Sequence, residues 1–137
     1  METPKQIVEK WYQALATGDW VTCHELAHPE VEWIMTEGFP DGGAYKGWRS
    51  FLKQIIPSIA KHFERIVSQV EAMHEAGNTV VVTGIYHGTT KDTKQSFAAK
   101  FVHIWTIEDG KLRRLDQLAD TAIIQTALRT PETVPAP

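Results

Sequence analysis

The stretch KFVHIWTIEDGK, residues 100–111, constrains most strongly how this chain can fold. Side chains of a strand alternate between its two faces. One face of this strand therefore carries three large apolar residues and one histidine: Phe101, Trp105, Ile107 and His103. The Asp-Gly pair that follows is a strong signal for a tight turn into another antiparallel strand. A row this apolar must be covered by other elements, so the sequence predicts a sheet whose buried face contains an imidazole.

Helical patterns occupy the first part of the chain. The residues TPKQ at 3–6 combine an N-cap, a proline at the first helical position and a glutamine three residues after the cap. Apolar residues then recur at helical spacing, and Gly18 ends this helix as a C-cap. Asp19 is expected to cap a second helix that runs to about Ala27 and is stopped by Pro29.

A short strand, a loop and a third helix follow. Residues 31–35 alternate as a strand does, and the glycine-rich segment 37–47 is expected to be a loop. Residues 48–59 place their apolar side chains on one side of a helix. Pro57 falls inside this helix, so we expect the helix to be kinked there or to end early.

The remainder of the chain is dominated by strand patterns separated by turn signals. Helices followed by a meander of antiparallel strands indicate an α+β fold, with the helices covering one face of a curved sheet. We expect a single domain over residues 1–128 and a weakly ordered, proline-rich tail over 129–137. The expected strand segments are 63–76, of mixed character, then 79–90, 95–108 and 111–121.

Composition narrows the classes of function. The chain of 137 residues has a net charge of -3, which argues against a nucleic-acid partner because phosphates require a basic surface. Its single cysteine excludes an intrachain disulfide and a zinc site built from cysteines. The polar first residues do not have the pattern of a signal peptide, and no apolar run is long enough to span a membrane. We therefore expect a cytoplasmic protein with no membrane partner.

Four segments carry a resemblance to a known superfamily: WYQALATGDW, VEW, GFPDGGAYKG and FVHIWTIEDGKLRRLDQLADT. Their order over residues 5–125 resembles the nuclear transport factor two-like superfamily, and within it the SnoaL-like, ketosteroid isomerase-related branch. The resemblance implies a cone-shaped fold in which three N-terminal helices pack on a strongly curved, mostly antiparallel sheet. It says less about function, because one fold of this kind hosts many activities.

At the positions that match the functional residues of those relatives, this chain has residues of other types. Ketosteroid isomerase has a tyrosine on the first helix, an aspartate base on the first strand and a second acid on a later strand. Alignment puts Trp11 at the first position, with Tyr12 beside it, and Trp33 and His103 at the others. Ketosteroid isomerase uses an aspartate base together with a protonated acid, and neither carboxylic acid is present here. Steroid isomerisation by that mechanism is therefore disfavoured. The aspartate of SnoaL-like cyclases and limonene-type epoxide hydrolases aligns with Gln117.

Two registers of the last hairpin give different sites. A two-residue Asp-Gly turn sets His103 opposite Asp116 and would bury a base-and-orienter pair. A three-residue turn with a bulge at Gly110 places Leu115, Gln117 and Ala119 on the His103 face and turns Asp116 outward. We favour the bulge, because leucine and alanine suit an interior better than the charged residues between them.

His103 is the leading candidate for an acid or base in a pocket, with Gln117 and Tyr12 as its partners. The alternative is a core histidine whose nitrogens are satisfied by backbone, glutamine or tyrosine. Glu37 and Asp116 are the runner-up acid or base candidates. The expected pocket lining consists of Trp33, Met35, Trp48, Phe51, Phe101, Trp105 and Leu115.

The sequence therefore predicts a cofactor-free small-molecule enzyme for proton transfer: an isomerase, cyclase, dehydratase (a lyase) or hydrolase acting on a hydrophobic carbonyl- or hydroxyl-bearing substrate. The alternatives are a non-catalytic ligand-binding protein and a scaffold whose core its own tryptophans fill. We expect no metal, since His24 and His28 at a helix end form only a weak pair. We also expect a homodimer through the convex sheet face, which carries Ala98, Val102, Ile104 and Thr106.

Overall fold

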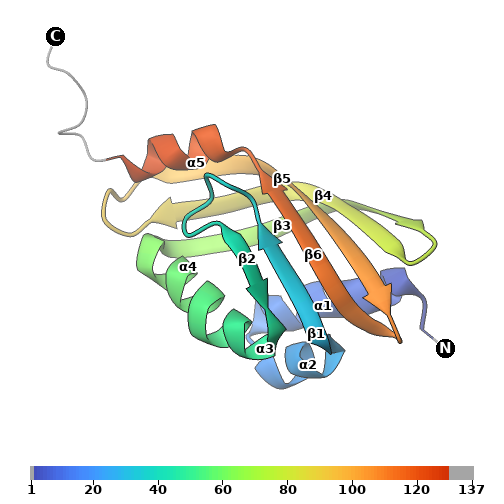
Figure 1. Ribbon diagram of the computed structural model, residues 1–137. Coiled ribbons are helices and arrows are strands. Elements are labelled where there is room, and N and C mark those ends of the chain that lie inside the picture. The colour runs from blue at the N-terminus through green and yellow to red at the C-terminus, as the bar shows by residue number, and fades with distance from the viewer. Residues whose placement is uncertain (1, 130–137) are drawn as a thin grey trace, which may run out of the picture.

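The computed structural model describes residues 2–129, and its framework is one curved six-stranded sheet (Figure 1). All neighbouring strands are antiparallel except the β1/β6 pair, which is parallel. The predicted α+β class and the cone-shaped fold are therefore confirmed. In spatial order the strands are β2 (Gly43–Lys46), β1 (Ala27–Met35), β6 (Lys111–Ala119), β5 (Ser96–Glu108), β4 (Thr79–Thr90) and β3 (Phe63–Ala76).

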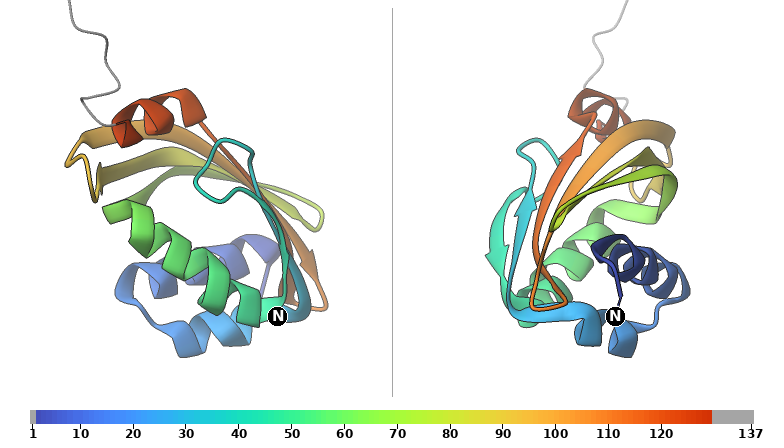
Figure 2. Two further views of the ribbon diagram at one scale, coloured as in Figure 1. Left: turned by 60° about the vertical axis from the view of Figure 1, so that its left-hand side comes forward. Right: turned by 90° about the vertical axis from the view of Figure 1, so that its right-hand side faces the viewer.

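Helices close the concave side of the sheet (Figure 2). The helix α1 (Pro4–Thr17), the short α2 (Trp20–Leu26) and a continuous helical run over residues 47–62 lie on that side. The sequence patterns did not predict the helix α5 (Thr121–Leu128). It packs against β5, at the end of the sheet that lies away from α1 and α2. No helix within residues 2–129 is long and apolar enough to cross a membrane.

The caps of α1 form as the sequence predicts. The Thr3 hydroxyl accepts a hydrogen bond from the Gln6 backbone N–H, and the Gln6 side chain accepts one from the Thr3 N–H. Gly18 ends the helix in the left-handed region, at a φ of 68°. Both ends of α1 are thereby set locally, and its buried face, which includes Trp11, is directed at the sheet.

A π-helical turn accommodates the proline in the third helical run. The run consists of α3 (Gly47–Ser50), a π-helix (Phe51–Ile55) and α4 (Ile56–His62). The expected early end at Pro57 is therefore wrong, and a π-helical irregularity lies where a kink was the alternative. The Ile56 N–H donates to the Phe51 carbonyl, the five-residue spacing of a π-turn. The wider turn directly before Pro57 relieves the clash that a proline ring makes with the preceding turn. It also directs Phe51 and Ile55 into the interior.

Two further local expectations were wrong. Pro29 does not stop α2, which ends at Leu26; it lies within β1, where the pairing with β6 is interrupted between Ala27 and Glu32. A proline costs no ladder hydrogen bond at such an irregularity. The glycine-rich segment 37–47 is not entirely a loop, because its last residues form the edge strand β2 against β1. The tail beyond residue 129 lies outside the described residues.

The β5–β6 hairpin combines features of the two registers considered. The turn takes two residues, Asp109 and Gly110, both at positive φ, and it pairs Glu108 with Lys111. The extra residue is Arg113, so the bulge is in β6 and not at Gly110. Its guanidinium binds Glu108 at 2.9 Å on the solvent side.

The shifted register decides which β6 side chains face the helices. Beyond the bulge, Gln117 lies directly opposite His103, and Leu115 lies opposite Trp105. Asp116 pairs with Ile104 on the outer face. The predicted facing of Gln117 and Asp116 is therefore correct, although the bulge that produces it was predicted three residues too early.

Gly84 on β4 makes room for an aromatic ring below the interior histidine. A Cβ atom at this position would lie 2.2 Å from the Gln69 carbonyl oxygen and 2.6 Å from the Phe101 ring. That ring in turn stacks against Tyr86 at a centroid distance of 4.5 Å and against His103 at 4.2 Å. The smallest residue at 84 is therefore required for the packing under the histidine.

We predict that Gly84→Ala lowers the free energy of unfolding by roughly 1–3 kcal/mol, the usual cost of overpacking. The added methyl group would clash with both the β3 backbone and the Phe101 ring, so both must move away from it. Urea unfolding followed by far-UV circular dichroism measures the change. Thr83→Ala, on the opposite face of the same strand, is the matched control. Equal stability of the two variants would show that the Gly84 contact does not matter.

The predicted homodimer concerns the outer face of the sheet. Val102, Ile104 and Thr106 lie there half-buried and Ala98 is exposed, while Leu118 on the adjacent strand is 47% exposed. The homodimer stays a prediction, with the physical reason that a second copy would remove these apolar side chains from water. Sedimentation velocity at micromolar concentration is expected to give twice the chain mass, and a monomer would contradict it.

Candidate functional site

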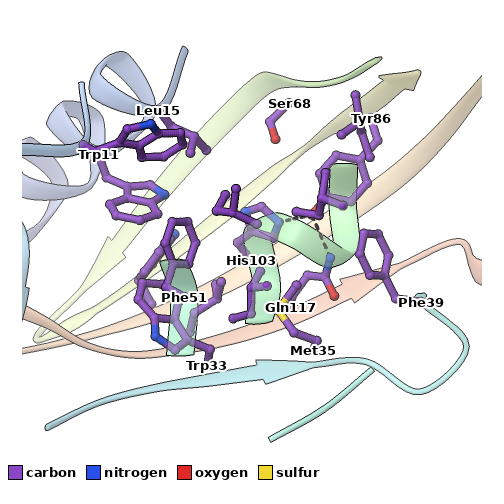
Figure 3. A pocket seen from close by; sticks show the side chains of 17 residues that line it. Trp11, Leu15, Trp33, Met35, Phe39, Phe51, Ser68, Tyr86, His103 and Gln117 are labelled. Carbon is purple, nitrogen blue, oxygen red and sulfur yellow. Dashed lines mark hydrogen bonds between the residues drawn. The ribbon is translucent and has the colours of Figure 1, made fainter. Parts of the chain in front are cut away.

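A cavity of about 250 Å³ lies between the helices and the inner face of the sheet (Figure 3). This volume is slightly below the roughly 300–1,000 Å³ typical of pockets for drug-sized ligands. Trp20, which is 38% exposed, also lines the cavity, so the cavity reaches the surface beside α2. The predicted alternative of a core filled by its own tryptophans is not supported, because the interior is hollow next to His103.

One wall of the cavity is aromatic. The Trp33 ring lies 4.7 Å from Phe51 and 5.6 Å from Trp11, measured between centroids. Phe39, from the segment after β1, lies at the other side of the cavity, beyond Gln117 (Figure 3). These walls exclude water and favour an apolar ligand body.

The polar atoms in the cavity are few. Besides tryptophan indoles, the described lining residues with polar side chains are Ser68, Tyr86, His103 and Gln117. No carboxylate, lysine or arginine of residues 2–129 lines the cavity. The chemistry of the cavity is therefore that of uncharged hydrogen-bonding groups.

His103 is held between two tyrosines. Its Nδ1 lies 2.5 Å from the Tyr12 hydroxyl on α1, and its Nε2 lies 2.5 Å from the Tyr86 hydroxyl on β4. The imidazole is 6% exposed, so both nitrogens need such partners to be buried without penalty. Both imidazole nitrogens therefore have a hydrogen-bond partner, and neither is left unpaired in the cavity.

Two further donors complete the network. The Trp105 indole N–H donates to the Tyr12 oxygen at 3.0 Å. The Gln117 Nε2 donates to the Tyr86 oxygen at 3.0 Å, while its Oε1 accepts the Thr36 backbone N–H at 3.2 Å. A backbone N–H only donates, so this contact fixes the orientation of the Gln117 amide.

Burial keeps the whole network uncharged. Desolvation lowers the pKa of His103 to about 3, because the imidazolium form loses its hydration. Desolvation raises the pKa of Tyr12 and of Tyr86 well above the usual value of a phenol, against the smaller lowering effects of their hydrogen bonds to Trp105 and Gln117. The histidine is therefore a neutral imidazole at physiological pH.

Comparison with known proteins identifies the family. The sequence model of the SnoaL-like domain matches residues 8–115, most of the chain. The chain belongs to the SnoaL-like family. The resemblance inferred from the sequence is thereby confirmed. No curated protein is similar enough in sequence to count as a match.

Solved structures place this SnoaL-like domain within the nuclear transport factor two-like fold. An NTF2-like protein from Burkholderia thailandensis is 29% identical, with a TM-score of 0.89 over 94% of this chain and 99% of that chain. TerC, co-crystallised with polyporic acid, is 25% identical, with a TM-score of 0.82 over 92% and 98%. A candidate SnoaL-like polyketide cyclase from Jannaschia sp. is 18% identical, with a TM-score of 0.79 over 93% and 92%, which shows the fold alone.

The SnoaL-like domain brings most of the predicted lining residues to the cavity. Two are exceptions. Trp48 stacks on His24 at the outer side of Phe51, and Phe101 is covered by His103 and Tyr86. Both pack behind the lining because the residues in front of them are themselves large rings. The predicted residues that do line the cavity are Trp33, Met35, Phe51, Trp105, Leu115, His103 and Gln117.

The remaining candidates lie away from the cavity. Tyr12 does not line the cavity, although its hydroxyl is hydrogen-bonded to His103 Nδ1. Glu37 is exposed in the segment after β1. Asp116 lies on the outer face and forms a two-pronged pair with Arg114, at 3.0 and 3.1 Å. Neither carboxylate is positioned as the acid or base of this cavity. Within residues 2–129, no three metal-binding side chains form a cluster.

Sequence reasoning missed Tyr86 and Ser68. The signal for Tyr86 was present in TVVVTGIYHGTT, where Val80, Val82 and Tyr86 share a face by simple alternation. Ser68 lies opposite Tyr86 in the β3–β4 register, on the same face. The sequence of that strand mixes helix-forming and strand-forming residues, so its alternation does not assign Ser68 to a face.

We predict that acid weakens this SnoaL-like domain through His103. The folded-state pKa of about 3 lies below the unfolded value of about 6.5, so between these pH values the unfolded chain binds more protons. The stabilisation is complete above pH 6.5 and falls by up to about 1.4 kcal/mol per pH unit as the pH drops toward 3. The titratable side chains facing His103 are Tyr12 and Tyr86, which stay neutral throughout this range.

Urea unfolding between pH 4.5 and 7.5 measures this effect. The His103→Gln variant is expected to lose that part of the slope, whereas the same exchange at the exposed His74 is the matched control for removing a histidine. An unchanged slope in His103→Gln would show that His103 is not the group responsible.

Proposed function

We propose that this SnoaL-like domain is a cofactor-free enzyme that binds a small hydrophobic molecule and assists proton transfer at its carbonyl or hydroxyl oxygen. The observation that carries the proposal is the neutral cluster of Tyr86, His103 and Gln117 in a cavity whose other described lining, apart from Ser68 and the tryptophan indoles, is apolar. Buried polar groups that converge in an apolar pocket are the usual sign of a ligand site.

The cluster suits the stabilisation of negative charge on a ligand oxygen. Hydrogen-bond donors that are already oriented in a site without water act strongly on an oxyanion as it forms. Tyr86 lines the cavity and is itself supported by His103 and Gln117. His103 therefore acts by supporting Tyr86. The sequence alone predicted a different role for His103, that of an acid or base in contact with the ligand.

This arrangement favours some proton-transfer reactions over others. The described cavity lining contains no carboxylate and no free imidazole nitrogen to abstract a proton. A cyclisation in which an oxygen of the substrate takes up the proton from the substrate's own acidic C–H bond balances without a basic side chain, so it is favoured over an isomerisation that needs one. TerC, which shares the fold at 25% identity, was co-crystallised with polyporic acid, and this supports an organic ligand for the cavity. The polyketide cyclase among the structural neighbours agrees in fold class.

A non-catalytic ligand-binding protein is the second candidate function. The observation in its favour is that each imidazole nitrogen and each buried side-chain polar atom already has a partner within residues 2–129. A saturated, neutral network can hold a ligand without reacting. Turnover separates the two functions, because only an enzyme changes the ligand that it binds.

We predict that Tyr86→Phe lowers kcat by roughly 10²- to 10³-fold on the true substrate, the usual loss when one oxyanion donor is removed. His103→Gln, which withdraws the support of Tyr86, is expected to lower kcat as well. The substrate is sought among small carbonyl compounds, lactones and epoxides, with binding detected by fluorescence of the cavity tryptophans.

Tyr45→Phe is the matched control. It also removes a phenolic hydroxyl, but that hydroxyl binds the Asp41 carbonyl outside the cavity. Full activity of Tyr86→Phe would refute the catalytic proposal. Binding without turnover in the wild type, across ligands that respond to Tyr86→Phe, would establish the second function instead.

A further inference from the structure

We infer that the Tyr86 hydroxyl directs its proton into the cavity, as the last donor of a one-way hydrogen-bond chain from Trp105 through Tyr12 and His103. The site would therefore select ligands that present a carbonyl oxygen, an acceptor, over ligands of the same shape that lack one. The inference deepens the proposed function and rests on it for the existence of a ligand.

The first step is that each tyrosine oxygen already accepts one hydrogen bond. The Trp105 indole only donates, so the Tyr12 oxygen is the acceptor in their 3.0 Å contact. The Gln117 amide is oriented by the Thr36 N–H, so its nitrogen donates to the Tyr86 oxygen. Each hydroxyl retains its own proton to place.

The second step is a count of protons around the imidazole. A neutral histidine has one N–H and one bare nitrogen. Its two contacts with Tyr12 and Tyr86 therefore have room for two protons, but three are present: the imidazole proton and one from each hydroxyl. One tyrosine must turn its proton away from His103.

The third step identifies that tyrosine from its surroundings. Tyr12 is half-buried, its hydroxyl contacts His103 and Trp105, and it does not line the cavity. Tyr86 does line it. Only at Tyr86 does a proton turned away from the imidazole face a space that a ligand can occupy. Tyr12 then donates to Nδ1, and the Nε2–H donates to Tyr86.

These choices align every donor in the same direction. The chain runs from the Trp105 indole to Tyr12, to His103, to Tyr86 and into the cavity. Figure 3 shows the end of this chain, where His103 and Gln117 lie beside Tyr86. Hydrogen bonds arranged head to tail polarise one another, so the last donor is strengthened by those before it. A ligand oxygen that gains negative charge receives this strengthened donor.

The chain also defines what the ligand must present. A carbonyl oxygen accepts without bringing a further proton, so it complements Tyr86 directly. Ser68, on the neighbouring strand opposite Tyr86, carries a hydroxyl that both donates and accepts and does not itself discriminate. Selectivity for an acceptor therefore depends on Tyr86 and on the groups that set the direction of its proton.

A first experiment needs neither a variant nor a ligand. Nitrogen-15 NMR distinguishes the two tautomers of a neutral histidine, and the His103 ring signals are assigned through their correlations to the backbone. We expect His103 to be protonated at Nε2 and bare at Nδ1. The opposite tautomer would mean that Tyr86 donates to the imidazole, and it would overturn the inference.

A second experiment compares 1-tetralone with tetralin, two probes of nearly the same shape of which only the first has a carbonyl oxygen. Wild type is expected to bind the ketone roughly three- to tenfold more tightly, the usual size of one neutral hydrogen bond. In Tyr86→Phe this ratio should fall to about one with tetralin affinity retained, while Tyr45→Phe keeps the wild-type ratio. The infrared C=O stretch of bound 1-tetralone should shift to lower frequency in wild type and not in Tyr86→Phe.

The outcomes separate this inference from the proposed function. Equal binding of both probes by wild type would overturn the donor chain and leave a small-molecule cavity intact. Binding of neither probe would count against the small-molecule function itself, and the ligand selectivity would fall with it. A Tyr86→Phe variant that keeps the wild-type preference for the ketone would show that the donor is a different group.

Discussion

The structure depends on how a buried imidazole is satisfied. His103 occupies an apolar strand face, where an unpaired ring nitrogen would carry a large desolvation cost. Its partners are supplied by elements far apart in sequence, Tyr12 from α1 and Tyr86 from β4. The Tyr12 contact therefore links the first helix to the sheet, and the Tyr86 contact lies in the wall of the cavity. Packing and polar satisfaction are achieved by the same side chains.

The neutrality of this network accounts for the character of the cavity. A charge placed beside His103 would be as poorly hydrated as the imidazolium itself, and the described lining contains no carboxylate or cationic side chain. Relatives that use an acid-base pair have polar residues where this SnoaL-like domain has Trp33, whose ring packs at a tilt against Phe51 in the aromatic wall. The described lining therefore has uncharged hydrogen-bonding groups and no acid-base pair of charged side chains.

Local sequence signals predicted much of the secondary structure. The capping residues of α1, the turn at Asp109 and the alternation in β5 each act over a few residues, so they could be recognised directly. The errors concern features with non-local causes. Pro29 is tolerated because of an interruption in the β1–β6 pairing, and the hairpin register depends on the extra residue Arg113. No pattern within those segments specifies a partner strand.

The sequence by itself determined that His103 would lie in the interior, because strand alternation places it among large apolar residues. For Gln117 the sequence favoured an inward position in one of two possible registers. It did not determine what His103 would bind. Tyr86 and Trp105 reach the network through strand pairing, and Tyr12 reaches it through the packing of α1 on the sheet. Hydrogen bonds between side chains need positions correct to a fraction of an ångström. Periodicity assigns a face but not a distance, so only the tertiary structure decided that the histidine would be held between two tyrosines, one of which lines the cavity with it.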